Sequence, residues 1–233
     1  ARQLLKGPVA SGTAARTEGL GVEAWQDSPQ PTFRGQPVAL ASREVSRSLA
    51  AVAGGGVLLG ADWSLRLLAG DGSVRWQRSA PAATWGVNAA PQSAFAVAAY
   101  GDGTLRWHRL SDGQELLALF MHADRKRWVL WTPSGYYDAS PGAEELIGWH
   151  INRGQGASAD FFAASRLRSQ FYRPAVIDRV LDTLDEAEAA RDAESTLVAT
   201  ALAPAAAQVP SIAPAPAPVA LPLPLPVPLP VPL

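Results

Sequence analysis

The stretch that decides the fold is ADWSLRLLAGDG at residues 61–72, which returns in altered form as GDGTLRWHRLSDG at residues 101–113. Aligning Asp62 with Asp102 gives a repeat length of 40 residues. Each copy holds a short apolar run next to turns rich in Gly and Asp, a pattern typical of antiparallel strands joined by tight turns. A repeat of about 40 to 45 residues built from short strands indicates the blades of a β-propeller.

The clearest blade surrounds the second copy of the repeat. It is predicted to have the strands TWGVNA, FAVAAY, TLRWHRL and ELLALF. The preceding blade is predicted as SLAAVA, VLLGA, SLRLLA and SVRWQR. A weaker third copy has RWVLWT, GYYDAS and LIGWHI, in which Trp149 aligns with Trp107, and it shows no obvious fourth strand. The predicted fold class is therefore all-β, with about three WD-repeat-like propeller blades. Since closed propellers have about four to eight blades, we expect an incomplete ring.

The rest of the chain divides by composition. Residues 1–41 predict an irregular lead-in with short strands, and the blades occupy residues 42–154. Residues 155–195 predict a helical extension, because Val, Ile and Leu recur at helical spacing after Pro174 and the opposite face is acidic. Residues 196–233 form an Ala- and Pro-rich tail of low complexity, ending in LPLPLPVPLPVPL.

The tail is predicted to be disordered or to form a polyproline II rod, because Pro at alternate positions removes backbone donors and excludes an α-helix. For the same reason it does not span a bilayer, in spite of its apolar side chains. A linker is the favoured interpretation. The alternative is a weak ligand for an aromatic-lined groove.

Composition excludes several function classes. The 20 basic and 21 acidic residues nearly balance, so no field attracts nucleic acid. The chain has no cysteine, which removes disulfides and a thiolate nucleophile. The first residues lack the pattern of a secretion signal, and we expect a cytoplasmic location. The three histidines fall on successive strands or turns, so we expect no metal site.

Several strings resemble the last blades of bacterial WD-repeat proteins that commonly carry a caspase-like peptidase domain. They are YGDGTLRWHRLSDGQELLALF, RWVLWTPSGYYDASPGAEELIGWHINRG and FYRP, within a similarity that covers roughly residues 21–185. In those relatives the peptidase is a separate unit with a histidine motif and a cysteine motif. Neither motif is present in this chain. The resemblance therefore implies the propeller without the protease.

The resemblance also implies a structural network of His, Asp and Trp within each blade. Asp102 and Trp107 match this pattern in one blade, and His122 and Trp149 match parts of the next. Asp62 aligns with Asp102, but a leucine stands where its tryptophan would be, so we expect an incomplete network.

Loops at the ends of blades are the usual docking surfaces of such folds. Arg127, Tyr136 and Tyr137 are the residue types that anchor interfaces, and we predict them as interface residues.

These observations predict a non-enzymatic propeller module for protein interaction or scaffolding, with no catalytic residue, cofactor or metal. Its expected partners are proteins, including missing propeller blades or a caspase-like protease. One alternative is the regulatory or sensor segment of a caspase-like system whose catalytic domain lies on another chain. The other alternative is a truncated remnant of a longer WD-repeat protein.

Overall fold

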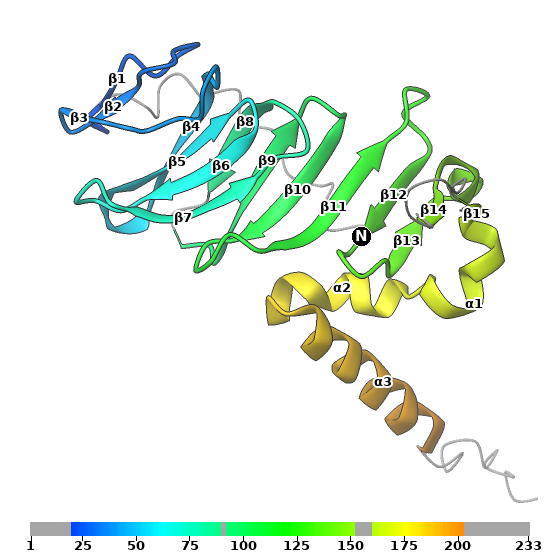
Figure 1. The fold of residues 1–233 in the computed structure, drawn as a ribbon. Helices are drawn as coiled ribbons and strands as arrows, with labels where there is room; N and C mark the ends of the chain where they lie inside the picture. The colour runs from blue at the N-terminus through cyan, green and yellow to red at the C-terminus, as the bar shows by residue number, and fades with distance from the viewer. Residues whose placement is uncertain (1–19, 90–91, 152–159, 203–233) are drawn as a thin grey trace, which may run out of the picture.

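The computed structural model describes residues 20–89, 92–151 and 160–202, and its ordered body is built mainly from antiparallel sheets (Figure 1). The strands are β1 (Val22–Glu23), β2 (Thr32–Phe33), β3 (Gln36–Pro37), β4 (Ser46–Val52), β5 (Gly56–Ala61), β6 (Ser64–Leu68), β7 (Val74–Ser79), β8 (Thr84–Ala89), β9 (Phe95–Tyr100), β10 (Thr104–Arg109), β11 (Glu115–Met121), β12 (Trp128–Trp131), β13 (Tyr137–Ala139), β14 (Gly148–Ile151) and β15 (Asp160–Ala163). The helices are the 3-10 turns η2 (Ala53–Gly55), η3 (Ala143–Leu146) and η4 (Ala164–Leu167), followed by α1 (Arg168–Phe171), α2 (Pro174–Thr183) and α3 (Glu186–Leu202).

The first blade is the four-stranded sheet β4-β5-β6-β7, with every strand antiparallel to its neighbour. Its two middle strands are buried along their whole length, because both faces of the sheet are covered. Leu58 and Leu65 pack toward the second blade, whereas Leu49 and Leu59 pack toward the strands at the N-terminus. The four strands predicted from residues 48–78 are confirmed.

The second blade is β8-β9-β10-β11, which are the four strands predicted for the clearest repeat. Side chains alternate between its faces: Ala96, Ala98 and Tyr100 join the core shared with the first blade, whereas Phe95 and Val97 pack on the opposite side. This alternation follows from the two-residue period of a strand. The fold class predicted from the repeat, propeller blades in an incomplete ring, is confirmed.

The two blades are joined on their inner side, between β4 and β8, and on their outer side, where β7 meets the turn after β10. On the inner side the Ser48 hydroxyl donates to the carbonyl of Thr84 at 2.7 Å. On the outer side the Trp76 indole donates to the carbonyl of Leu110 at 2.8 Å. The ring of Trp76 also lies so close to Gly113 that a Cβ there would sit 2.5 Å from it. The glycine of the SDG turn is therefore needed for blade packing as well as for the turn, which has a positive φ of 76°.

The third blade, predicted with three strands and no obvious fourth, does not form a sheet of its own, and that part of the prediction is wrong. Strand β12 pairs with β11 and β13 pairs with β12, so they extend the second blade into a six-stranded sheet with the order β13-β12-β11-β10-β9-β8. Strand β14 pairs instead with β15, a strand that the sequence did not predict. The third repeat copy is therefore divided between the edge of one sheet and a separate hairpin.

In each blade, the face that is turned away from the other blade is covered by another part of the chain. The three-stranded sheet β1-β2-β3 and the segment after it place Phe33 and Val38 on the first blade. On the second blade, Val176, Ile177 and Val180 of α2 pack against Trp107 together with residues of α3. Figure 1 shows α2 beside the strands β11–β13, whereas α3 packs against α2 and runs away from the body of the molecule.

From Pro174 onward the chain forms two helices, α2 and α3, where a single helix was expected. Pro174 stands in the first turn of α2, as predicted, since it needs no donor there. The break comes at Leu184, which has a left-handed φ of 57° and donates its N–H to the carbonyl of Val180. Helix α3 continues to Leu202, beyond the boundary at residue 196 where the Ala- and Pro-rich tail was predicted to begin. The rest of that predicted tail, residues 203–233, lies outside the described residues.

Candidate functional site

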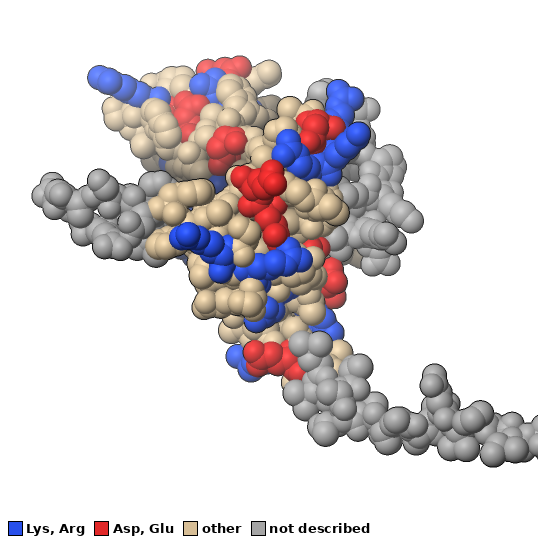
Figure 2. All heavy atoms as spheres, turned by 90° about the vertical axis from the view of Figure 1, so that its right-hand side faces the viewer, with Lys and Arg blue, Asp and Glu red and all other residues tan. Residues whose placement is uncertain are grey.

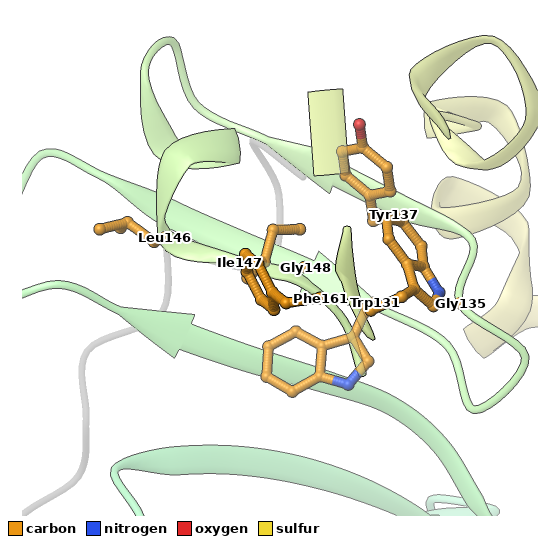
Figure 3. Close-up of a pocket in the computed structure, with 8 residues that line it drawn as sticks. Trp131, Gly135, Tyr137, Leu146, Ile147, Gly148 and Phe161 are labelled. Atoms are coloured by element: carbon orange, nitrogen blue, oxygen red, sulfur yellow. The ribbon is translucent and has the colours of Figure 1, made fainter. Parts of the chain in front are cut away.

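A pocket of about 430 Å³ lies where the edge of the second sheet meets the β14-β15 hairpin (Figure 3). Its volume falls within the range of small-ligand and peptide-anchor pockets, about 300–1,000 Å³. The lining side chains are aromatic and aliphatic, with two glycines between them: Trp131, Gly135, Tyr137, Leu146, Ile147, Gly148, Trp149 and Phe161. We call this site the aromatic pocket.

Tyr137 forms the buried base of the aromatic pocket. Its backbone pairs with Trp131 across β12 and β13, and its side chain is 1% exposed. The hydroxyl donates to Glu144 Oε1 at 3.0 Å. Burial, followed by the hydrogen bond to that carboxylate, raises the pKa of Tyr137 to about 12, so the phenol stays protonated at neutral pH. Tyr137 therefore contributes a fixed ring and no charge.

Glu144 is held in place by a second partner. Arg168 makes an ion pair with it, and the same guanidinium lies over the ring of Tyr172 at 3.9 Å from the ring centre. Tyr172 stacks edge-on to Tyr137 with ring centres 5.5 Å apart. These contacts connect η3 to α1 and fix the position of the Tyr137 ring.

Two glycines allow the rings to approach the backbone. A Cβ on Gly148 would lie 2.4 Å from the ring of Phe161, so the end of this ring lies against the β14 backbone. A Cβ on Gly135 would lie 3.3 Å from the indole nitrogen of Trp149, and Gly135 also has a positive φ of 100°. Both glycines are therefore part of the pocket wall, since larger residues would displace these aromatic side chains.

Trp149 links the pocket to the helical segment. Its ring lies 4.9 Å from that of Phe171, centre to centre, and 6.2 Å from that of Tyr137. Phe161 stands at the rim, 61% exposed, whereas Trp131 is half-buried. In Figure 3, Ile147 and Phe161 are drawn between Leu146 and Tyr137. The pocket is thus a mainly apolar cleft with one exposed aromatic side chain, Phe161, at its mouth.

The chemistry of the pocket suits binding. Its lining, over the described part of the chain, includes no charged side chain and no histidine, and the nearby Glu144 is already paired. An apolar, aromatic wall binds ligands by burying hydrophobic surface and by ring stacking. It provides neither an acid–base pair nor an activated nucleophile.

The aspartates of the expected blade network make local contacts. Asp102 Oδ1 accepts from the backbone N–H and the hydroxyl of Thr104, and Oδ2 accepts from Arg106 at 3.0 Å. Burial acts to raise the pKa of Asp102, but these hydrogen bonds outweigh it and the pKa lies below its usual value. Asp62 accepts from Arg47 at 2.7 Å and from the N–H of Val45. Asp102 therefore stabilises its own turn, whereas Asp62 links the β5-β6 turn to the start of β4.

The other expected network residues lie apart from one another. Trp107 packs against α2, Trp149 lines the pocket, and His122 lies half-exposed in a turn, 3.1 Å from Asp124. The buried histidine of the second blade is His108, which the alignment did not include in the network. Its Nε2 lies 2.9 Å from the Tyr100 hydroxyl, and burial lowers its pKa.

Of the three expected interface residues, the pocket contains Tyr137. Tyr136 points to the opposite side, where it packs with the helices and lies 6.4 Å from the ring of Phe171. Arg127 lies in the turn between β11 and β12 and pairs with Asp124 at 2.7 Å. The three residues therefore do not form one surface.

Sequence reasoning missed Trp131, Ile147 and Phe161 as site residues. The available signal was the concentration of aromatic residues between Trp128 and Phe171, more than a sheet of this size needs for its core.

Other kinds of site receive no support from the described residues. Within residues 20–89, 92–151 and 160–202, no group of three His, Cys, Asp or Glu side chains could hold a metal ion. None of the described helices is both long and apolar enough to cross a membrane. Figure 2 shows basic and acidic side chains interspersed over the face seen there, as the balanced net charge predicts.

Comparisons with known proteins give structural similarity at low sequence identity. BamB from Moraxella catarrhalis is 11% identical, with 51% of this chain and 41% of that chain covered and a TM-score of 0.34. The β-propeller domain of Cps50 (Swd1) from Myceliophteria thermophila is 13% identical, with 45% and 41% covered and a TM-score of 0.31. The computationally designed protein Ika4 is 13% identical, with 51% and 91% covered and a TM-score of 0.32.

The matched region spans about two fifths of BamB and of the Swd1 domain. No protein-family model matches the chain, and no curated protein matches it. With identities and TM-scores this low, the assignment of propeller-like blades rests on the two four-stranded units and their packing.

Proposed function

We propose that this chain is a non-enzymatic β-propeller module that binds another protein by inserting one of that protein's apolar segments into the aromatic pocket. The observation that carries the proposal is the pocket itself: four aromatic rings and two aliphatic side chains around about 430 Å³, with Phe161 at the mouth. Trp and Tyr in such settings supply most of the energy of protein interfaces. We include a cytoplasmic location in the proposal.

A short segment fits the structure better than a missing propeller blade. A following blade would pack on the outer face of the second blade, but Trp107, Leu117 and Leu130 on that face are already buried under α2 and α3. The corresponding face of the first blade is covered by the strands β1–β3. The pocket, in contrast, is open at Phe161.

A second candidate function is regulation of a caspase-like protease on another chain. It is favoured by where the resembling strings fall: GYYDASPG contributes Gly135 and Tyr137 to the pocket, and GWHINRG contributes Gly148 and Trp149. This candidate is tested by mixing the chain with a caspase-like peptidase encoded beside its gene. Binding that survives Phe161→Ser, or no binding at all, would refute a role for the pocket in that pairing.

The experiment for the main proposal is selection of peptides from a random library on the full chain, followed by affinity measurements on variants. Phe161→Ser removes the exposed ring at the pocket mouth. Leu105→Ser is the matched control, since Leu105 is 39% exposed on β10 and lies outside the pocket.

We expect apolar peptides whose affinity falls at least about tenfold with Phe161→Ser, the loss for about 1.4 kcal/mol of contact energy, and stays unchanged with Leu105→Ser. Peptides that bind both variants equally, or a selection that yields none, would contradict the proposal.

A further inference from the structure

We propose that the segment LPLPLPVPLPVPL at residues 221–233 of this same chain occupies the aromatic pocket and competes there with external partners. The inference rests on the proposed function of the pocket and names its ligand class: an apolar segment in the polyproline II conformation. The segment lies outside the described residues. The inference therefore rests on its sequence, on the lining of the pocket and on the position of α3.

The segment has the composition of a ligand for aromatic surfaces. Between Leu221 and Leu233, Leu or Val alternates strictly with Pro, and no side chain is polar. A polyproline II helix has three residues per turn. An alternating sequence therefore places both Pro and Leu or Val on every face, so that any face can enter an apolar cleft. Proline also fixes the backbone before binding, which lowers the entropic cost of association.

The pocket offers the complementary surface. Proline-rich segments dock on grooves lined by aromatic side chains, and Trp131, Trp149 and Phe161 supply such a lining. Neither the pocket lining nor the segment has a charged side chain that would have to be desolvated. The interaction would therefore depend on hydrophobic burial and on packing of rings against proline.

The chain between α3 and the segment is long enough. Helix α3 ends at Leu202, and residues 203–220 can span about 60 Å when extended. The helix itself is about 25 Å long at 1.5 Å per residue. The linker can thus return along α3, which points away from the body in Figure 1, and still reach the sheet edge.

Because the segment and the pocket belong to the same chain, a weak contact is sufficient for the segment to occupy the pocket. A linker that can span the distance between two sites of one chain gives an effective concentration on the order of millimolar. A segment with a dissociation constant in that range would fill about half of the pockets within single chains, whereas separate chains at micromolar concentration would show almost no binding. An external partner must displace the segment, so its apparent affinity falls in proportion to the free fraction.

The test uses a spin label and the tryptophan indole signals of the full chain. Because the sequence has no cysteine, Val227→Cys gives a single attachment site inside the segment. The readout is paramagnetic broadening of the indole N–H signals of Trp131 and Trp149. Trp63 and Trp85 serve as internal controls: they are 52% and 60% exposed, and they lie at the β5-β6 turn and on β8.

We expect the signals of Trp131 and Trp149 to lose most of their intensity at any protein concentration, while those of Trp63 and Trp85 keep theirs. Phe161→Ser should restore the pocket signals, and Leu105→Ser should not. Replacing Leu223 and Leu225 by Gln should also restore them without altering the folded body.

Equal broadening of all four indoles, no broadening, or broadening only between a labelled chain and a second, isotope-labelled chain would overturn the proposal. If selected peptides bind the pocket while the label leaves Trp131 unaffected, this inference fails and the proposed function stands.

Discussion

Gly148 determines the shape of the pocket, because the ring of Phe161 lies where a Cβ would project. We predict that Gly148→Ala destabilises the chain by about 1–3 kcal/mol, the usual cost of forcing an extra carbon into a packed site. The matched control is Gly86→Ala on β8, where the nearest atom to a Cβ is 3.7 Å away. Urea unfolding of the three proteins checks this. Equal stabilities for the two variants would contradict the packing described for Phe161.

The ion pair between Glu44 and Arg66 is a second residue-scale feature with a measurable consequence. The two side chains are 0% and 2% exposed and lie 2.7 Å apart. We predict that Arg66→Met lowers the free energy of unfolding by about 3–5 kcal/mol, because it leaves a buried carboxylate without its partner. Adding Glu44→Leu to that variant should recover most of the loss, since no unpaired charge remains. A double variant as unstable as the single one would refute this explanation.

The same pair makes stability depend on pH. Burial acts to raise the pKa of Glu44, but hydrogen bonds from Arg66, Ser64 and the N–H of Ala41 outweigh it, so the pKa in the folded state lies below the ordinary value of 4.5. A lowered pKa contributes stability above the pKa of the unfolded chain, and this contribution is lost as the pH falls through the folded value. Unfolding measured from pH 6 to 3 should therefore show a smaller acid-induced loss in the Glu44→Leu, Arg66→Met double variant. Parallel curves would contradict the assignment.

For single residues, the sequence predicted the positions of turns more accurately than the contacts between side chains. Asp62 and Asp102 were correctly placed after strands, but an aspartate in a tight turn finds its donors within the turn or on the adjacent strands. The expected link to a histidine needs a long-range approach that no local pattern encodes. Tyr137 was predicted as an interface residue and Trp149 as part of the blade network. The distance of 6.2 Å between their ring centres could not be predicted without the fold.

At the scale of elements, helix α2 takes the position that a following blade would occupy. We predict that Ile177→Ala, at a side chain 1% exposed, costs about 2–5 kcal/mol and shifts the fluorescence of Trp107 toward that of a hydrated indole. The matched control is Asp182→Ala on the exposed side of the same helix, which should leave both unchanged. An unaltered spectrum in Ile177→Ala would show that α2 does not cover this face.

The strands of both blades followed from their alternating pattern, but strand pairing after β11 did not. The connection from β7 to β8 spans residues 80–83 and leads to a new blade, whereas the connection from β11 to β12 spans residues 122–127 and adds a strand to the same sheet. Both connections are short. Loop length therefore cannot decide between the two outcomes, which depend on the packing of the following helices and of β14-β15.

On the scale of the whole molecule, two blades share one core and each outer face has its own covering, from β1–β3 on one side and from α2 and α3 on the other. Four aromatic residues that this core does not use gather at the junction of the β14-β15 hairpin with the sheet edge. We propose that this junction, and not exposed aromatic surface in general, binds partner segments.

The most direct test follows the indole N–H signals of the full chain during titration with a peptide selected on it. We expect shifts at Trp131 and Trp149, which line the pocket, and none at Trp63 and Trp85, although these two side chains are 52% and 60% exposed. Shifts of similar size at all four indoles, or at Trp63 and Trp85 alone, would contradict the proposal.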